Sequence, residues 1–213
     1  MRKIIIAFGP PGIGKGTVGS ALSKEMKLPL ISVGDLLRDA VKNQSGIGKK
    51  AENYMKKGEL VPDSLVFELL NERISQKDAS AGFILDGFPR NQQQVIMLEK
   101  VFIDGDICFA MNLEGSDKVI IERLSNRRIC EKCGAIYHLV NIPPEKEGIC
   151  DKCGGKLIQR VDDSPQIIAK RLDVFKNDTK PILDFYKKKG WLYSIFAEDK
   201  LSETLKLIHK VIH

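Results

Sequence analysis

The sequence contains no long hydrophobic run. The apolar stretch at residues 4–8 directly follows the first three residues and is too short for a signal peptide or a membrane span. No later stretch reaches the roughly 18 apolar residues that a transmembrane helix needs. Low-complexity tracts and internal repeats are also absent, apart from one local duplication of a cysteine pair. We therefore expect a cytoplasmic protein that does not bind a membrane.

An excess of acidic residues is absent too, because 34 lysines and arginines outnumber 28 aspartates and glutamates and give a net charge of +6. A positive net charge favours an anionic partner, and nucleic acid and free nucleotides both qualify. Histidine is scarce, and we assign no chemistry to His138, His209 or His213. With 213 residues, 43% of them hydrophobic, the chain is long enough for one domain, or for one domain that carries an insert.

Short apolar segments alternate with helical patterns along the chain, which predicts an α/β fold. The predicted strands are mostly unbroken apolar runs, as expected for a sheet that is buried on both faces. They cover residues 3–8, 29–33, 83–86, 107–113 and 191–196. Cys108 lies within the fourth run, and we expect it to be a small core residue.

Capping signals indicate where some of the helices begin and end. Asp35 is expected to cap a helix at residues 35–38, because its side chain can accept backbone N–H groups of a first helical turn. Further along, Ser164 and Pro165 have the order expected of an N-cap and a first helical residue. The long helix that starts there must be kinked or divided by Pro181.

Four of the five cysteines lie in residues 128–161, a segment without a long periodic pattern that we interpret as an insert. Two Cys-x-x-Cys pairs separated by sixteen residues have the spacing of a four-thiolate zinc site: Cys130, Cys133, Cys150 and Cys153. A segment of roughly 35 residues buries too little surface to fold alone, so a bound metal would supply the missing stability. A pair of redox disulfides is the alternative. Catalytic zinc is disfavoured, because four thiolates leave no open coordination position.

Residues 9–17, Gly-Pro-Pro-Gly-Ile-Gly-Lys-Gly-Thr, lack one feature of the usual phosphate-binding loop, the serine or threonine directly after the lysine. Gly16 stands there, so the magnesium ion of a nucleotide needs another ligand. The setting is otherwise as expected, because the loop follows a predicted strand and leads into a helical pattern. Its glycines allow N–H groups to face phosphate oxygens, and Lys15 adds a mobile charge. The alternative is a tight turn with a surface lysine.

Several further motifs accompany this loop. They are Ile-Ser-Val-Gly-Asp-Leu-Leu-Arg at residues 31–38, Gly-Glu-Leu-Val-Pro at 58–62, Asp-Gly-Phe-Pro-Arg at 86–90 with Gln94 beyond it, and the arginines Arg123, Arg127, Arg160 and Arg171. Together with the Gly-Lys-Gly-Thr ending of the loop, they resemble the motifs of the adenylate kinase family over nearly the whole chain. The segment with two cysteine pairs resembles the lid of the zinc-bearing bacterial long form.

The resemblance implies a P-loop kinase fold, in which helices flank a five-stranded parallel sheet. It implies a core made of residues 1–31, 62–127 and 162–213, an AMP-binding insert at 32–61 and a zinc-ribbon-like lid at 128–161. The implied reaction is the reversible transfer of a phosphoryl group from ATP to AMP, which gives two ADP, with Mg²⁺ on the ATP and structural Zn²⁺ in the lid. A monomer is the family expectation, and we expect no nucleic acid as partner.

The reaction needs no strong base, because the nucleophile is already an anionic phosphate oxygen, so catalysis can depend on alignment and on cancelling charge. By resemblance, the catalytic residues are Lys15, Arg90, Arg127, Arg160 and Arg171. The ATP-binding residues are Gly12, Ile13, Gly14, Lys15, Gly16, Thr17, Arg123, Arg127, Ile136 and Tyr137. The AMP-binding residues are Ser32, Val33, Arg38, Glu59, Leu60, Val61, Gly87, Phe88, Pro89, Arg90, Gln94, Arg160 and Arg171.

Two aspartates offer an answer to the missing hydroxyl at Gly16. The nucleotide's phosphates and water would bind most of the magnesium ion, because magnesium sheds its waters reluctantly. Asp35 and Asp86 would then orient those waters. Asp86 ends a predicted strand, where a carboxylate points into the ligand crevice of an open parallel sheet. Capping of the next turn is the alternative role for Asp86.

Base selection depends on fewer residues. By resemblance, Gln94 reads the adenine edge of AMP, because an amide offers a donor and an acceptor together. The family usually has threonine where this chain has Val33, so one polar contact near the acceptor base is in question. Ile136 and Tyr137 border the adenine of ATP in relatives, although Tyr137 also suits packing in a zinc ribbon. The turn at residues 196–199 departs from the family's usual Asp-Gly form and receives no assigned contact.

Two other functions are open at this point. A related nucleotide kinase that accepts CMP or UMP, or that uses GTP as donor, would share nearly every motif; Gln94 argues against a pyrimidine, and Val33 weakens that argument. A zinc-ribbon protein that binds nucleic acid, with a regulatory or motor phosphate loop, is the alternative from another class. Against it, Tyr137 is the only aromatic residue between Cys130 and Cys153 that is available for base stacking.

Overall fold

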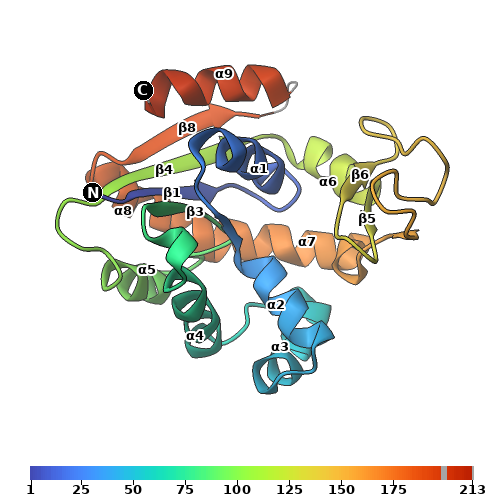
Figure 1. The fold of residues 1–213 in the computed structure, drawn as a ribbon, viewed down its shortest axis with the longest axis horizontal. Coiled ribbons are helices and arrows are strands. Elements are labelled where there is room, and N and C mark those ends of the chain that lie inside the picture. Colours follow the sequence, from blue (N-terminus) through green and yellow to red (C-terminus); the bar gives the residue numbers. More distant parts are fainter. Residues whose placement is uncertain (198–200, 213) are drawn as a thin grey trace.

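The computed structural model describes residues 1–197 and 201–212, and within them a parallel sheet of five strands forms the centre of the molecule (Figure 1). The strand order is β2-β3-β1-β4-β8. The strands are β1 (Lys3–Phe8), β2 (Leu30–Ser32), β3 (Gly82–Asp86), β4 (Ile107–Glu114) and β8 (Leu192–Phe196). All the predicted strands are confirmed, with ends that shift by no more than one residue.

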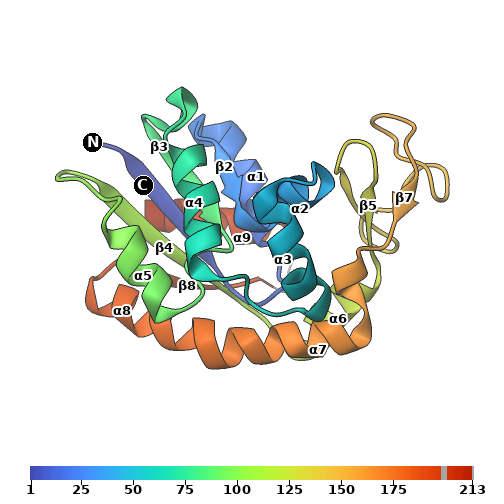
Figure 2. The same ribbon diagram turned by 90° about the horizontal axis from the view of Figure 1, so that it is seen from below.

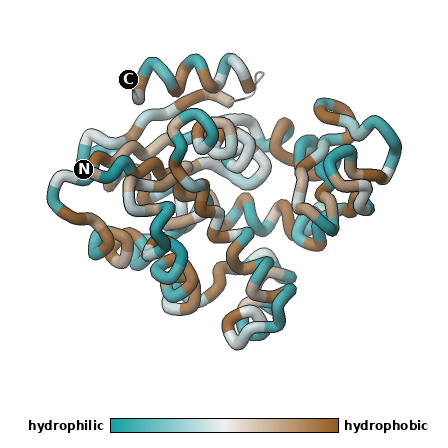
Figure 3. Tube along the Cα trace, viewed as in Figure 1, coloured by the Kyte–Doolittle hydropathy of each residue, from teal (hydrophilic) through white to brown (hydrophobic). Residues whose placement is uncertain are grey.

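Both faces of this sheet are covered, which explains its unbroken apolar strands. Along β1, Ile4 and Ile6 pack into one core and Ile5 into the other, and all three are completely buried. Cys108 on β4 is buried as predicted. Helices α4 (Asp63–Ile74), α5 (Gln92–Glu99) and α8 (Leu183–Lys188) contribute to the first core, and α1 (Lys15–Met26), α6 (Asp117–Ser125), α7 (Pro165–Val174) and α9 (Leu201–Ile212) to the second. Figure 3 shows the hydrophobic segments gathered towards the centre.

A pair of helices projects from the end of β2. The first, α2 (Val33–Lys42), begins after Ser32, whose hydroxyl accepts the backbone N–H of Asp35 at 3.3 Å. The prediction that Asp35 caps this helix is therefore wrong: Ser32 has the extended backbone of an N-cap, and Asp35 lies inside the first turn. The second helix, α3 (Gly46–Lys57), packs tightly on α2, since a Cβ on Gly48 would lie 2.0 Å from a carbonyl oxygen of α2.

Residues 128–161, the lid segment, form most of a small antiparallel sheet with the order β6-β5-β7. Its strands are β5 (Arg127–Cys130), β6 (Ile136–His138) and β7 (Leu157–Ile158). Tyr137 and Leu157 pack with two of the cysteines in a separate small core. Figures 1 and 2 both show this sheet at one end of the molecule, apart from the central sheet. The segment that contains the cysteine pairs thus has a small core of its own.

A long helical run returns from the lid segment along the side of the molecule (Figure 2). α7 begins at Pro165 after the N-cap residue Ser164, as predicted. The chain then passes through a π-helical turn, η3 (Phe175–Thr179), and a 3₁₀ turn, η4 (Lys180–Ile182), before α8. Pro181 lies in η4 and has no N–H to donate, so the helix is divided there, as predicted.

Two short 3₁₀ turns complete the elements of the described chain. They are η1 (Lys77–Ala79), which precedes β3, and η2 (Val161–Asp163), which connects the lid segment to α7. Within the described residues, no helix is both long and apolar enough to cross a membrane.

Candidate active site

The loop between β1 and α1 has the geometry of an anion-binding site. Gly12 and Gly14 have φ angles of 80° and 114°, which other residues rarely adopt. Gly14 is the N-cap of α1, and no side chain among the described residues caps that helix, so its first N–H groups are left for an anionic ligand. A Cβ on Gly12 would lie 2.6 Å from Leu124 of α6, so the loop also packs closely against its neighbour.

Lys15, the first residue of α1, folds back over this loop. Its Nζ donates to the carbonyl oxygens of Gly9 and Pro10, at 2.7 and 2.8 Å. Burial, together with the charges of neighbouring arginines, lowers the pKa of Lys15 to about 8, although the charge of Asp86 acts in the opposite direction. A bound anion would favour the charged form, so the lysine is placed for a negatively charged ligand.

Asp86 lies at the carboxyl end of β3, beside the loop. β3 pairs with β1 and β2, so this carboxylate lies where three neighbouring strands end. A Cβ on Gly16 would lie 3.7 Å from Oδ2 of Asp86, an ordinary contact distance. The carboxylate is thus next to the position of the missing hydroxyl. Asp35 is in a different setting, since it accepts a hydrogen bond from Nε of Arg38 at 3.1 Å and its side chain is 60% exposed.

Arginine side chains from several elements line the same cavity as this loop. They are Arg38 of α2, Arg90 after β3, Arg123 of α6, Arg127 of β5, Arg160 before η2 and Arg171 of α7. Burial, followed by the charges of Arg38 and Arg127, lowers the pKa of Arg160 to about 10. Its Nε is buried without a hydrogen-bond partner among the described residues. Such an accumulation of positive charge is suited to a polyanionic ligand.

Two aspartates fix part of this cluster. Asp163 is buried and accepts hydrogen bonds from Nε and Nη2 of Arg127, at 2.8 and 2.6 Å. Arg171 donates to the same carboxylate at 3.2 Å and pairs with Asp162 at 3.0 Å. Arg123 is held differently: its Nη1 donates to the carbonyl oxygens of Ile13 and Ala197, each at 2.9 Å. The planar guanidinium groups of Arg123, Arg127 and Arg171 are therefore oriented by the protein itself.

Two hollows adjoin these arginines. The larger has a volume of about 710 Å³ and extends from the phosphate loop to the lid segment and α9. The smaller, of about 80 Å³, lies among α2, α3 and α4 and is bordered by Val33, Gln94 and residues 58–61. Every residue that the sequence predicted for ATP, AMP or the magnesium water shell lines one of these hollows. The fold brings all of them together around one cleft.

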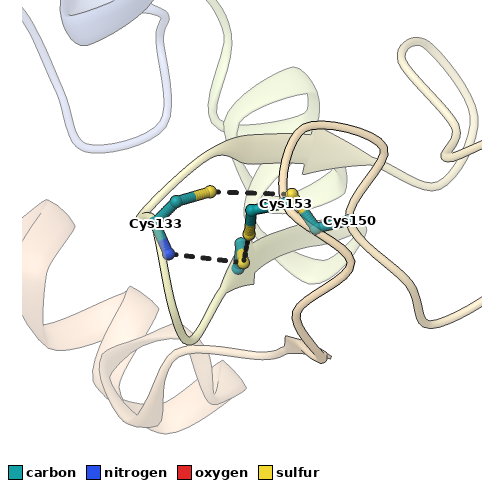
Figure 4. A group of neighbouring side chains, drawn as sticks. Cys133, Cys150 and Cys153 are labelled. Atoms are coloured by element: carbon teal, nitrogen blue, oxygen red, sulfur yellow. Dashed lines mark hydrogen bonds between the residues drawn. The ribbon is translucent and has the colours of Figure 1, made fainter.

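The four cysteines of the lid segment also come together, and Figure 4 shows three of them, Cys133, Cys150 and Cys153, side by side. Their Sγ atoms all lie within 4.8 Å of one another, and the closest pairs are Cys130–Cys153 at 3.4 Å and Cys133–Cys150 at 3.6 Å. None of them forms a disulfide in the described chain. A tetrahedral zinc ion with Zn–S bonds of about 2.3 Å separates its sulphurs by roughly 3.8 Å. The cluster therefore has the donor set and size for such an ion.

Tyr137 connects the cysteine cluster to the cleft. Its ring is buried, its hydroxyl accepts the backbone N–H of Asp151 at 2.8 Å, and the same oxygen lies 3.4 Å from Sγ of Cys150. The hydroxyl hydrogen is thus available to the sulphur, and this hydrogen bond lowers the pKa of Cys150, which favours the thiolate, the form of cysteine that can act as a metal ligand. Tyr137 also contributes to the wall of the larger hollow.

Comparison with known proteins identifies the family. The adenylate kinase model matches residues 7–191, which is most of the chain. This chain belongs to the adenylate kinase family. It is 48% identical to an adenylate kinase of Caldicellulosiruptor saccharolyticus over 100% of this chain and 99% of the relative. It is 46% identical to one of Caldicellulosiruptor bescii over 98% of both chains, and 47% identical to one of Staphylococcus aureus over 95% of both.

Membership of the adenylate kinase family gives the chain its chemical class. The similarity over nearly the full length supports adenylate kinase activity, and with it a phosphotransferase that acts on nucleoside monophosphates. The family uses magnesium nucleotides, and the four clustered cysteines can hold a metal ion.

One residue of this adenylate kinase cleft was missed by the sequence reasoning. His138 is buried, and its Nδ1 accepts the backbone N–H groups of Val140 and Asn141, at 3.2 and 3.0 Å. Because Nδ1 accepts, the proton of the neutral ring is on Nε2, which lies buried in the cleft wall without a partner among the described residues. The sequence offered one signal for this placement: His138 directly follows Tyr137, a residue predicted to border the ATP site. The unassigned positions 198–199 and His213 lie outside the described residues.

Proposed function

We propose that this chain catalyses the reversible, magnesium-dependent transfer of the terminal phosphoryl group of ATP to AMP, which gives two ADP. One observation carries the proposal: the two hollows meet along Arg38, Arg90 and Arg171, which line both. A donor with its phosphates on the loop and an acceptor with its base in the smaller hollow would bring their phosphates together at these arginines. Bidentate guanidinium groups are well suited to phosphate oxygens.

The charged residues near the junction of the two hollows fall into two groups, one for the phosphate of the acceptor AMP and one for the phosphates of the donor ATP. Arg90 is placed to hold the acceptor phosphate, because Nε donates to the carbonyl oxygen of Gly87 at 2.8 Å and fixes the guanidinium beside the smaller hollow. Arg38 lies beside it. Lys15 and Arg127 approach from the donor side. Together with Arg160 and Arg171 they would cancel the charge on the transferring group, and since an anionic oxygen attacks, no base is required.

Magnesium would be held mainly by the nucleotide's phosphates and by water. Asp86 fits the water shell, because its carboxylate is adjacent to Gly16 and therefore to phosphates on the loop. Asp35 is engaged by Arg38 and lies 3.9 Å from Nη2 of Arg160, and movement of both arginines onto phosphates would release its carboxylate for water. When bound, the ion neutralises negative charge on the phosphate oxygens. This assignment explains how the loop functions without a hydroxyl after its lysine.

Zinc is the ion proposed for the four cysteines, since thiolates at this spacing match its preferred geometry. Its role is structural: it stabilises a lid segment whose own core is small. We further propose that residues 128–161 close over ATP and residues 32–61 over AMP, while residues 1–31, 62–127 and 162–213 remain as the core. Closure excludes water, which would otherwise hydrolyse ATP. ATP, AMP and ADP would be the partners of a cytoplasmic monomer.

A broader acceptor choice is the second candidate function. Val33 is buried in the wall of the smaller hollow, where its side chain offers no hydrogen bond to a base. Gln94 is then the uncharged polar side chain that this wall presents. A kinase with relaxed selectivity would keep the same phosphate chemistry and lose only the preference for adenine.

An acceptor panel tests the proposed function. Transfer from magnesium-ATP to AMP, CMP, UMP, GMP and dAMP is followed by direct measurement of the diphosphate products. We expect AMP to be strongly preferred. Comparable rates with a pyrimidine acceptor would favour the broader kinase, and the absence of transfer to every acceptor would contradict both.

A further inference from the structure

The carboxamide of Gln94 lies between two partners of opposite kind. Its Oε1 accepts the backbone N–H of Arg90, and its Nε2 donates to Oδ1 of Asp63, both at 2.7 Å. Gln94 is 2% exposed and lies in the wall of the smaller hollow. A backbone N–H can only donate and a carboxylate can only accept. A 180° rotation of the amide would therefore break both hydrogen bonds. It would also place the NH₂ group against the N–H of Arg90 and the amide oxygen against the carboxylate of Asp63.

The carboxylate of Asp63 organises more than this one contact. Asp63 is the first residue of α4, and its Oδ1 and Oδ2 also lie 3.0 and 3.2 Å from Nδ2 of Asn91. Asn91 is the N-cap of α5, where its Oδ1 accepts the backbone N–H of Gln94 at 2.8 Å. One carboxylate thus receives the NH₂ groups of two amides and directs both. Asp63 itself lines neither hollow among the described residues, so it acts through its neighbours.

The orientation of Gln94 determines which base it can pair with. A carboxamide has two hydrogens on its nitrogen and two lone pairs on its oxygen, so one of each is left after these contacts. Adenine offers an N–H donor beside a ring nitrogen that accepts, whereas hypoxanthine offers a carbonyl oxygen beside an N–H. A carboxamide that turned freely could pair with either base. One that is held with its nitrogen towards Asp63 presents a single pattern to the hollow.

We propose that Asp63 is a positioning residue that makes the acceptor site selective for adenine by fixing the carboxamide of Gln94. The inference depends on the proposed function, because it requires the acceptor base to enter the smaller hollow. It also links base recognition to phosphate binding. The same carboxamide holds the backbone of Arg90, whose carbonyl oxygen accepts from Oγ1 of Thr179 at 3.0 Å.

The test compares AMP with IMP, whose base is hypoxanthine. With magnesium-ATP as donor, kcat/KM is measured for both acceptors with the wild type and with the variants Asp63→Ala and Asp63→Asn. We expect Asp63→Ala to lower the AMP-to-IMP ratio by roughly ten- to a hundredfold, the effect of losing a hydrogen bond to a charged group. Asp63→Asn should restore most of the ratio, because its side-chain oxygen still accepts from Nε2 of Gln94.

The matched control is Asp117→Ala. Asp117 is also the first residue of its helix, α6, and it pairs with Lys176 at the surface at 2.6 Å. Its removal should leave the ratio unchanged. If Asp63→Ala does not fold, as judged by circular dichroism, Asp63→Ser is measured in its place, because the serine hydroxyl is polar but lies one atom nearer the backbone than the carboxylate oxygen that accepts from Gln94.

The outcomes separate this inference from the proposed function. A wild type that prefers AMP, together with folded Asp63 variants that keep the same AMP-to-IMP ratio, would overturn the inference alone. A wild type that transfers phosphate to no monophosphate would overturn the proposed function. A ratio that falls with Asp63→Ala, recovers with Asp63→Asn and is unchanged with Asp117→Ala would support the positioning role.

Discussion

Lys15 is the residue at which the electrostatics of the cleft can be measured. Its pKa falls from an ordinary 10.5 to about 8, mainly through burial. Between these two pH values the unfolded chain binds more protons than the folded one, so this group's contribution to stability rises with pH across that window. Below about pH 8 the folded protein carries the full unfavourable free energy of a buried lysine charge among arginines. A bound polyphosphate would offset it.

We predict that nucleotide binding takes up protons at pH 8. The phosphates should raise the pKa of Lys15, and a group that is half protonated at that pH can take up about half a proton. Calorimetric titration with ATP in buffers of different ionisation enthalpy measures this uptake. The control is Lys15→Arg, which keeps a charge that does not titrate. Equal uptake by the wild type and by Lys15→Arg would contradict the assignment.

Asp86→Asn tests the answer to the missing hydroxyl. The substitution keeps the shape of the side chain and removes its charge, so nucleotide affinity should change little. Turnover should fall by about 10- to 100-fold, the range for losing a group that orients the ligands of a metal. Steady-state kinetics across a magnesium titration make the measurement. A magnesium-dependent rate equal to that of the wild type would remove Asp86 from the mechanism.

Individual residues were predictable from the sequence where a motif identified them. Lys15 and Arg90 belong to such motifs, and both line the cleft. Asp63 and His138 belong to no motif. Asp63 contacts Gln94, which lies 31 positions further along the sequence. Nε2 of His138 is a donor only because Nδ1 accepts two backbone N–H groups. Pairings across such distances depend on the folded backbone, which a local pattern does not encode.

At the level of elements, the contact between α2 and α3 has a single decisive position. A Cβ on Gly48 would meet backbone atoms of α2 at 2.0 to 2.6 Å, and backbone cannot move aside cheaply. Gly48→Ala should therefore lower the free energy of unfolding by about 1–3 kcal/mol and weaken AMP binding. Gly46→Ala is the control. Gly46 lies in the same helix, and a Cβ added there would have no neighbouring atom within 4 Å. Chemical denaturation compares the two. Equal stability of the variants would refute the close contact.

Removal of the metal should affect the lid segment first. Its core is small, so without an ion we expect the melting temperature to fall before the central sheet is affected. Differential scanning calorimetry with and without a chelator measures the change, and Cys133→Ser should reproduce it. Cys108→Ser changes a thiol in the main core, outside the cluster. Its melting temperature should fall on chelation by as much as that of the wild type. An unchanged melting curve on chelation would contradict a structural metal.

The elements show where sequence reasoning succeeds. The strands were predicted nearly to the residue because a sheet covered on both faces requires unbroken apolar runs, and β1 has one. The cap of α2 was assigned wrongly because Asp35 and Ser32 are both good caps, and the backbone conformation decides between them. The strands of the lid segment were not predicted, since each is short and depends on pairing rather than on periodicity.

For the whole molecule, the decisive feature is a cleft built from parts far apart in the chain. The phosphate loop, the helix pair, the lid segment and α7 all contribute to it. Motifs in the sequence indicated that these parts belong together and named the family, which the comparisons then showed. The junction of the two hollows at Arg38, Arg90 and Arg171 had to be seen in the structure. This junction explains how the phosphates of two nucleotides could meet for phosphoryl transfer.

The most direct measurement of this claim is the fate of the terminal phosphate of ATP, followed by ³¹P NMR with magnesium and AMP present. The predicted result is the loss of one ATP and one AMP for every two ADP formed, with no release of inorganic phosphate, and the reverse reaction when ADP is supplied alone. The contradictory result is conversion of ATP to ADP and inorganic phosphate at a rate that AMP does not change, because the cleft would then serve hydrolysis rather than transfer.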